Sequence, residues 1–247
     1  MAADRRFHRV VDFLGEAGFA RVRGASVTVV GLGGVGCHAA LALARSGIGG
    51  LMLVDFDILT ETSLNRNPIA GPQDVGSYKV DLMAGHIRTT CPDTRVTVRK
   101  AFYHEDTSEE LLSSEEDALV DAIDSLGPKA ALLESCVRLG LPVFSSMGAS
   151  GRRDPSLVRV SDISDTSACP LARKLRKYLR KRGIENGIKC VYSLEPAGDH
   201  SLPPDVEDLT MNRGRVRNRI PSLITMPGIF GYSLAGLVLE HLAGQEG

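Results

Sequence analysis

Residues 25–49 read ASVTVVGLGGVGCHAALALARSGIG, and this stretch decides the fold. Its first part, residues 25–31, is a β-branched apolar run, which predicts a buried strand. The glycines at 31–36 then open a segment whose composition predicts a helix ending near Gly47 or Gly49. A strand, a glycine-rich turn and a helix in this order are typical of a unit that binds phosphate at the helix N-terminus.

The same alternation of strand and helix continues along the chain. Further strands are predicted at residues 50–57, 95–101, 118–125 and 141–148, and helices at 79–91 and 128–140. Strands that alternate with helices favour a parallel sheet with right-handed crossovers. We therefore expect an α/β fold, a Rossmann-like, doubly wound and mostly parallel sheet with helices on both faces.

We expect residues 1–247 to form a single domain, with a nucleotide-binding core at 26–150 and a basic tail at 151–247. In the tail, the patterns predict an edge segment at 154–163, a helix at 169–183, strands at 189–196 and 213–220, and a closing apolar helix at 223–243. The tail is too short for a separate domain, so it should continue the sheet and pack back on the core. The apolar core of the last stretch falls short of the roughly 20 residues that span a bilayer.

Composition places the chain among globular proteins and suggests its compartment. Hydrophobic residues make up 43% and charged residues 24% of the sequence, the balance of a soluble domain. Its five cysteines are scattered and include no CxxC pair, which argues against structural zinc and favours a reducing environment. The first residues contain no apolar signal region, so we expect a cytoplasmic location.

The glycine-rich loop by itself leaves two ligands open. Gly31, Gly33, Gly34 and Gly36 allow a phosphate to approach backbone N–H groups closely. Asp55 ends the next predicted strand, where a carboxylate can bind a ribose hydroxyl. These features suit NAD and ATP about equally.

The charged residues that follow separate the two ligands. Arg66, Lys79 and Asp124 are expected at the carboxyl edge of the sheet, together with Asp55 and Asp57. Hydride transfer needs an apolar slot for nicotinamide, whereas cations neutralise phosphate oxygens and an aspartate can hold Mg²⁺. The set therefore favours ATP with magnesium.

At this point the sequence resembles the ThiF/MoeB/HesA superfamily, the bacterial relatives of ubiquitin-activating enzymes. The motifs VVGLGGVG, VDFD, NRN, VGSYKV and DAIDS occur in the right order. The resemblance implies an enzyme that binds ATP and Mg²⁺ and adenylates a carboxylate. It implies an ATP site made of Gly31, Gly33, Gly34, Gly36, Asp55, Asp57, Ser63, Asn65, Arg66, Lys79, Asp124 and Ser125, with Asp124 as the magnesium ligand.

The resemblance also implies a homodimer, because Arg9 corresponds to an arginine that the family's dimer partner donates into the neighbouring site. Arg9, Arg66, Lys79 and Asp124 are the expected catalytic residues. Three positions depart from the common pattern. Ser63 and Asn67 stand where the family commonly has Asn and Gln, and Cys37 stands where it commonly has Ser. Because of Ser63 and Asn67, a further alternative is a non-catalytic scaffold protein that retains the fold.

Residues 145–184, together with ARSGIG at 44–49, narrow the resemblance to one branch of the superfamily. They are similar to the tRNA threonylcarbamoyladenosine dehydratases, which implies an ATP-dependent cyclisation of that nucleoside in tRNA through an acyl-adenylate. The alternative is an adenylyltransferase that activates the C-terminus of a ubiquitin-like sulfur-carrier protein, with a sulfur-transfer protein as a further partner. The basic tail and the missing zinc cysteines weigh against this alternative.

Cys169 precedes the predicted basic helix and has two interpretations. A thiol at a helix N-terminus among Arg and Lys is expected to have a depressed pKa, as a nucleophile or persulfide acceptor would. The more common role at such a position is that of a small capping residue. Intramolecular cyclisation needs no thiol, which favours the capping role.

The basic tail predicts a surface for tRNA. Residues 151–220 have a formal charge of +6 and the rest of the chain −7, so the net charge of −1 hides a strong asymmetry. The alternative is a solvated helix next to an edge strand protected by charge. The candidate phosphate contacts are Arg173, Arg176, Lys177 and Arg180 on the helix and Arg213, Arg215, Arg217 and Arg219 on the strand.

Overall fold

The structure is a computed structural model that describes residues 4–104, 111–112, 116–196, 202–203 and 220–244. It contains a seven-stranded sheet with the strand order β3-β2-β1-β4-β5-β7-β6. The strands are β1 (Ser26–Val30), β2 (Gly50–Val54), β3 (Arg95–Arg99), β4 (Ala118–Asp121), β5 (Val143–Ser146), β6 (Val158–Asp162) and β7 (Lys189–Ser193). All neighbours pair in parallel except β6, which lies antiparallel to β7 at the edge.

This order confirms the expected fold class, because β3-β2-β1-β4-β5 is the strand order of a doubly wound dinucleotide-binding fold. β7 and β6 extend the sheet beyond β5, as expected for the tail. The four arginines of the predicted strand at 213–220 lie outside the described residues. In the described part of the chain, no helix is long and apolar enough to cross a membrane.

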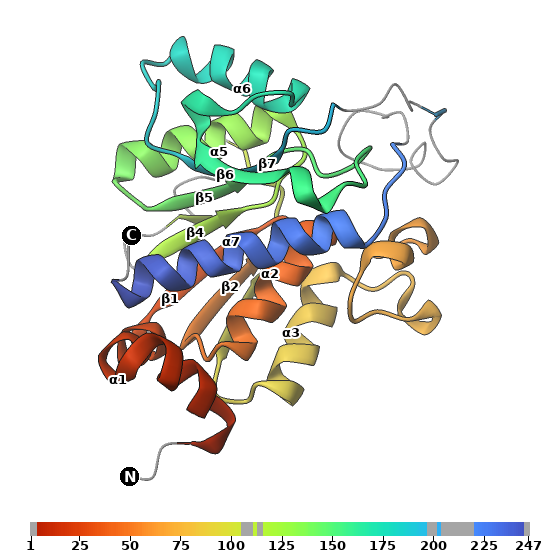
Figure 1. The fold of residues 1–247 in the computed structure, drawn as a ribbon. Helices are drawn as coiled ribbons and strands as arrows, with labels where there is room; N and C mark the ends of the chain where they lie inside the picture. Colours follow the sequence, from red (N-terminus) through yellow and green to blue (C-terminus); the bar gives the residue numbers. More distant parts are fainter. Residues whose placement is uncertain (1–3, 105–110, 113–115, 197–201, 204–219, 245–247) are drawn as a thin grey trace.

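The helices cover both faces of the sheet (Figure 1). They are α1 (His8–Gly24), α2 (Gly34–Arg45), α3 (Lys79–Thr90), α5 (Leu126–Leu139), α6 (Pro170–Arg180) and α7 (Thr225–Ala243). One apolar cluster joins α1, α2, α3 and α7 to one face of the sheet, and a second joins α5 and α6 to the other. Successive strand residues point to opposite faces. Val29 accordingly belongs to the first cluster and Val30 to the second.

The closing helix α7 packs against α2 and backs the glycine-rich loop. A Cβ at Gly231 would lie only 2.4 Å from the Val35 carbonyl oxygen, so glycine is needed for this close approach. At the start of α7, Pro227 Cβ lies 3.0 Å from where a Cβ of Gly34 would be. The sequence predicted a buried closing helix, but not that it supports this loop.

Candidate functional site

The glycine-rich loop connects the end of β1 to the start of α2. Gly31 has a φ of +90°, and a Cβ on it would lie 2.9 Å from the Ala122 main chain. A Cβ on Gly36 would lie 1.8 Å from the Gly31 carbonyl oxygen, whereas a Cβ on Gly33 would meet no atom within 4 Å. Gly31 and Gly36 therefore allow the tight turn, while Gly33 faces open space. The loop ends at a helix N-terminus, where unpaired N–H groups and the helix dipole attract phosphate.

Asp55 anchors this loop from the end of β2. Its Oδ2 accepts a hydrogen bond from the Leu32 backbone N–H, and its Oδ1 accepts one from the Asp57 N–H at 2.7 Å. Burial raises the pKa of Asp55, and the nearby Lys79 ammonium offsets part of that effect. The carboxylate predicted on the ribose side thus holds the glycine-rich loop in place.

Lys79 and Asp57 form a partly open ion pair beside the loop. The Lys79 Nζ lies 2.7 Å from Asp57 Oδ2, with side-chain exposures of 11% and 25%. Burial opposes the charged Lys79 ammonium, but Asp55 and Asp57 outweigh it and raise the pKa of Lys79. Asp57 Oδ1 is buried and has no hydrogen-bond partner among the described residues. A free acceptor of this kind fits a donor such as a ribose hydroxyl.

Arg66 reaches the loop from the 3-10 helix η2 (Glu61–Arg66). Its Cγ lies 3.3 Å from where a Cβ of Gly34 would be. Its guanidinium donates to the Thr62 carbonyl at 2.6 Å and to Asn65 Oδ1 at 3.1 Å. Asn65 in turn donates to the Ser222 carbonyl at 3.0 Å. Arg66 is therefore held at the loop by its own helical turn.

The three departures from the family pattern have local partners. Asn67 Oδ1 accepts from the Ile69 and Ala70 N–H groups, at 3.0 and 3.1 Å, and Asn67 Nδ2 lies 3.7 Å from Cys37 Sγ. Two of the departures therefore meet each other. The Ser63 hydroxyl pairs with that of Thr60 at 3.0 Å. These contacts stabilise the turn that carries Arg66.

Asp124 and Ser125 lie in the connection between β4 and α5. This connection abuts the glycine-rich loop, since the Ala122 N–H donates to the Val30 carbonyl at 2.9 Å. Asp124 is exposed, and the Ser125 hydroxyl donates to Asp124 Oδ1 at 3.4 Å. An exposed carboxylate at this edge is accessible to a cation bound to phosphates.

A buried ion pair beneath Asp124 was missed at the sequence level. Lys129 Nζ lies 2.5 Å from Asp121 Oδ2, and both side chains are fully buried. Lys129 also donates to the Ile123 carbonyl at 2.8 Å, and the Ser145 hydroxyl donates to Asp121 at 2.6 Å. The pair therefore fixes the main chain next to Asp124. Its signal was a lysine on the apolar face of a predicted helix, which carries Leu132, Leu133 and Cys136.

Arg9 and Cys169 do not join this group. Arg9 is exposed on α1, and Figure 1 shows α1 well apart from the 3-10 turn η2 that carries Arg66. Cys169 is the N-cap residue of α6 and only 4% exposed, and its side chain makes no capping hydrogen bond. Reactive cysteines are normally partly accessible, so this burial weighs against a nucleophile.

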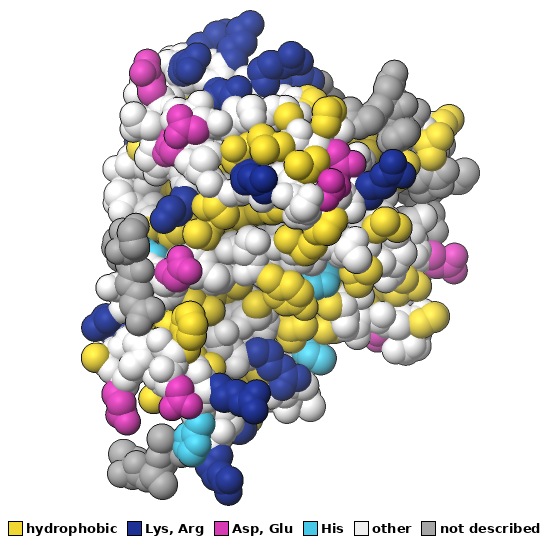
Figure 2. Space-filling view, in the orientation of Figure 1, with side chains coloured by type: hydrophobic (Ala, Val, Ile, Leu, Met, Phe, Trp, Pro, Cys, Tyr) yellow, Lys and Arg dark blue, Asp and Glu magenta, His cyan; other side chains and the backbone are white. Residues whose placement is uncertain are grey.

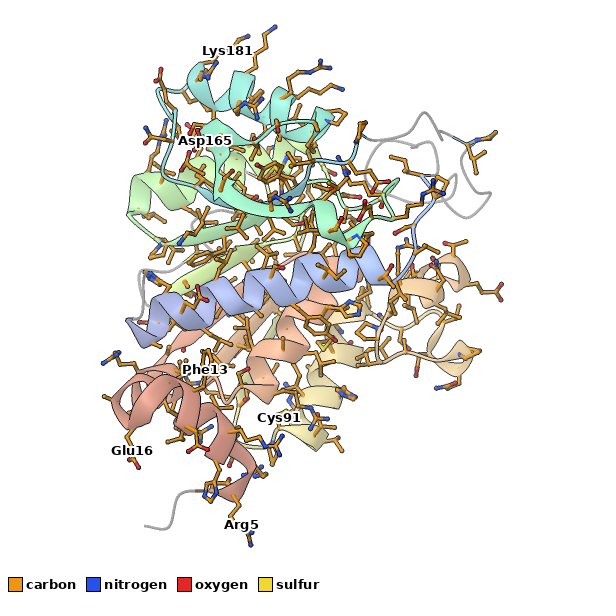
Figure 3. All side chains as sticks on the ribbon, viewed as in Figure 1. Arg5, Phe13, Glu16, Cys91, Asp165 and Lys181 are labelled. Carbon is orange, nitrogen blue, oxygen red and sulfur yellow. The ribbon has the colours of Figure 1, made fainter. Side chains whose placement is uncertain are left out.

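The basic side chains of α6 lie on one exposed face of the helix, except for that of Arg176. Figure 2 shows Lys and Arg gathered over this helix, and Figure 3 shows Lys181 projecting from its end. Arg173, Lys177 and Arg180 are exposed. Arg176 instead turns inward and donates to the Thr166 carbonyl at 2.7 Å. We call the exposed set Arg173, Lys174, Lys177, Arg180 and Lys181 the α6 basic face.

The fold and site together define a Rossmann-like protein whose charged groups suit a nucleoside triphosphate. The ThiF family profile matches residues 6–247, and the chain belongs to this family. The resemblance seen in the sequence is thereby confirmed.

Within the family, the chain is similar to tRNA threonylcarbamoyladenosine dehydratases. It is 36% identical over 236 residues to the enzyme of Bacillus subtilis (strain 168), covering 95% of this chain and 91% of that protein. It is also similar to crystal structures of the Escherichia coli enzyme. The complex with AMP has a TM-score of 0.86 at 33% identity, covering 98% of this chain and 95% of that chain. The complex with ATP has a TM-score of 0.85 at 32% identity, covering 98% and 97%.

Proposed function

We propose that this protein is an ATP-dependent dehydratase that cyclises threonylcarbamoyladenosine in tRNA through an acyl-adenylate. The observation that carries the ATP part is the convergence of Arg66 and Lys79 on the glycine-rich loop at the N-terminus of α2. An apolar nicotinamide slot would not place cations there. Similarity to dehydratases along nearly the whole chain supports the substrate.

The chemistry suits a site that offers positioning and charge more than covalent catalysis. The substrate carboxylate attacks the α-phosphorus of ATP, and the bond to pyrophosphate breaks. The carbamoyl group then attacks the acyl-adenylate within the same molecule, closes a ring and expels AMP. The nucleoside loses the elements of one water. Arg66 and Lys79 stabilise the negative charge that develops on the phosphate oxygens.

Asp124 is the proposed magnesium ligand. The described residues contain no group of three or more His, Cys, Asp or Glu that could hold a metal by themselves. A magnesium ion bound mainly by phosphates needs only one or two carboxylates. The exposed Asp124 meets that need, and the ion would neutralise phosphate charge when bound.

The direct test is conversion of the modified nucleoside. The protein is incubated with ATP, Mg²⁺ and tRNA that carries threonylcarbamoyladenosine, and the nucleosides are then analysed by mass spectrometry. We expect ATP-dependent loss of one water and formation of AMP and pyrophosphate. An α,β-methylene analogue of ATP is the control and should block the reaction. ATP–pyrophosphate exchange that requires a carrier protein, without nucleoside conversion, would instead establish the alternative adenylyltransferase.

We further propose a homodimer in which α1 meets the partner subunit. Phe13 on α1 is 79% exposed, and Figure 3 shows Glu16 projecting from this helix away from the sheet. The same helix borders a hollow of about 190 Å³, lined by Asp4, Phe7, Val11, Glu16, Phe19 and Ala20. A large exposed aromatic side chain on a helix that also borders a hollow is typical of an interface. Arg9 lies on the same helix and would reach the partner's site.

Mixing two inactive variants tests that exchange of residues. Arg9→Ala and Lys79→Ala subunits are mixed and allowed to exchange. If Arg9 acts in the partner's site, each mixed dimer has one intact site, and about a quarter of wild-type activity returns after random exchange. No recovery despite proven mixed dimers would mean that Arg9 does not act across the interface.

Two further features complete the proposal. The α6 basic face would bind tRNA phosphates, since exposed cations on one face suit a phosphate backbone. The free cysteines at 37, 91, 136, 169 and 190 are all buried, which fits the reducing cytoplasm where we place the reaction. Because cyclisation involves no sulfur and Cys169 is buried, the proposed reaction includes no sulfur-transfer partner.

A further inference from the structure

A second charged group lies at the carboxyl edge of the sheet, away from the glycine-rich loop. Arg152 follows β5, in the connection to the 3-10 helix η5 (Pro155–Leu157). It is only 5% exposed, while the next residue, Arg153, is exposed. Among the arginines of the tail that the structure describes, Arg152 is therefore the one that is buried, and it has no role in the site described above.

Within the described part of the chain, the Arg152 guanidinium donates its hydrogen bonds to main-chain carbonyls. Its Nη1 donates to the Gly148 carbonyl, and at 3.3 Å to that of Ser150. Its Nε donates to the Glu195 carbonyl at 3.2 Å. Its Nη2 is buried and has no hydrogen-bond partner among the described residues.

The side chain of Glu195, whose carbonyl accepts from Arg152, is committed to other donors. Glu195 Oε2 accepts hydrogen bonds from the Arg153 and Asp154 N–H groups, both at 2.9 Å. Those backbone hydrogen bonds lower the pKa of Glu195, as expected for a carboxylate committed to amide donors. No ion pair of Arg152 occurs within the described ranges.

A buried guanidinium needs a counter-charge, because it cannot deprotonate and loses its hydration. Carbonyl dipoles supply part of that compensation and orient the group. Nη2 remains as a donor for an anionic oxygen. This arrangement is that of a preformed binding group for an anion.

The position indicates which anion would bind. β5 lies between β4, whose carboxyl end leads to Asp124, and β7, whose carboxyl end leads to Glu195. Neighbouring strands are about 4.8 Å apart, and Arg152 and Asp124 follow the carboxyl ends of two such neighbours, so both lie along the same edge of the sheet. A tRNA phosphodiester is flanked by bulky sugars and suits exposed cations better than a group with 5% exposure. A carboxylate at the end of a side chain is the smaller anion and needs the smaller opening to approach such a group.

We propose that Arg152 Nη2 binds the carboxylate of the threonylcarbamoyl group and thereby selects tRNA that already carries it. With Nε and Nη1 occupied by carbonyls, only one carboxylate oxygen would be bound. The other oxygen stays available to attack the α-phosphorus. This inference rests on the proposed function and adds a substrate-binding residue to it.

The test compares Arg152→Gln with the exposed neighbour Arg153→Gln as the matched control. Binding is measured by filter retention with tRNA that carries the threonylcarbamoyl group and with the same tRNA lacking it. For Arg152→Gln we expect about 10- to 100-fold weaker binding of the modified tRNA, the range of a charged hydrogen bond. Its binding of unmodified tRNA and of ATP should match wild type, as should all three measurements for Arg153→Gln. Equal losses for both tRNAs, or no loss, would overturn the proposal.

A second measurement uses only folded wild-type protein. The methyl ester of the threonylcarbamoyl carboxylate should bind wild type as weakly as the acid binds Arg152→Gln. Wild type that binds ester and acid equally well would refute the role of Arg152. Wild type that fails to convert the acid at all would refute the proposed function instead, so the two failures are distinguishable.

Discussion

Two lysines in the first turns of helices pair with aspartates at the carboxyl edge of the sheet, yet the two pairs differ in exposure. Lys79 begins α3 and pairs with Asp57 after β2, and Lys129 lies in the first turn of α5 and pairs with Asp121 at the end of β4. The first pair is 11% and 25% exposed, and the second is fully buried.

The carboxylates of Asp121 and Asp57 also differ in how many of their oxygens accept hydrogen bonds. Both oxygens of Asp121 have donors, from the Ile123 N–H, Lys129 and Ser145. Asp57 keeps Oδ1 without a partner among the described residues. The comparison shows that a saturated pair supports the main chain, whereas an unsaturated and accessible pair can bind a ligand.

The largest expected effect is on the buried pair. Lys129→Met leaves the Asp121 carboxylate buried and uncompensated, so we expect a loss of about 3–5 kcal/mol in the free energy of unfolding. Urea denaturation measures it. Combining Lys129→Met with Asp121→Asn removes the remaining charge and should restore most of the stability. If Lys129→Met were as stable as wild type, the supporting role would be wrong.

The accessible pair should respond in rate more than in stability. For Lys79→Met we expect conversion about 10²- to 10³-fold slower, the cost of losing one preorganised contact to developing charge. The stability loss should be clearly smaller than for Lys129→Met. The matched control is Lys100→Met, which breaks the exposed pair with Asp81 and should leave turnover unchanged. Equal stability losses at Lys79 and Lys129 would remove the distinction between the two pairs.

The basic residues of α6 also divide into exposed side chains and one, Arg176, that is engaged in an internal hydrogen bond. Changing Arg173 and Lys177 together to Gln should weaken tRNA binding roughly tenfold and reduce its salt dependence by about two phosphate contacts. Arg176→Gln should leave tRNA affinity near wild type and lower the melting temperature, because it loses its bond to Thr166. Filter binding across a salt series and thermal unfolding measure the two effects. A loss of affinity for Arg176→Gln equal to that of the double variant would contradict this assignment.

The smallest expected effect is on the reactivity of the buried Cys37 thiol and its dependence on pH. Burial raises the pKa of Cys37 to about 12, so the thiol stays protonated at pH 8 and its reactive thiolate increases only as the pH approaches 12. We expect native protein to resist iodoacetamide at Cys37, while protein unfolded in urea is labelled readily. Mass spectrometry of peptides after labelling checks this. Rapid labelling of the native protein at pH 8 would show that the loop opens.

Local patterns were sufficient to predict much of the fold and the proximity of some of the charged residues. The run at 25–36 predicted β1, the loop and α2, and the spacing of Asp57 and Lys79 placed both at one edge. The helix α1 was not predicted. Lys129 was missed because a lysine in the first turn of a helix is usually solvated, and only packing against β4 and β5 buries it.

The sequence by itself determined the order of strands and helices, the glycine-rich loop and the charges that suit a triphosphate, because these depend on residues close together in the chain. Tertiary structure decided which charges remain accessible. It buried Lys129 and Arg152, turned Arg176 inward, and pressed α7 against the loop at Gly34. Burial and hydrogen bonding between distant segments govern those outcomes, and no local pattern encodes them.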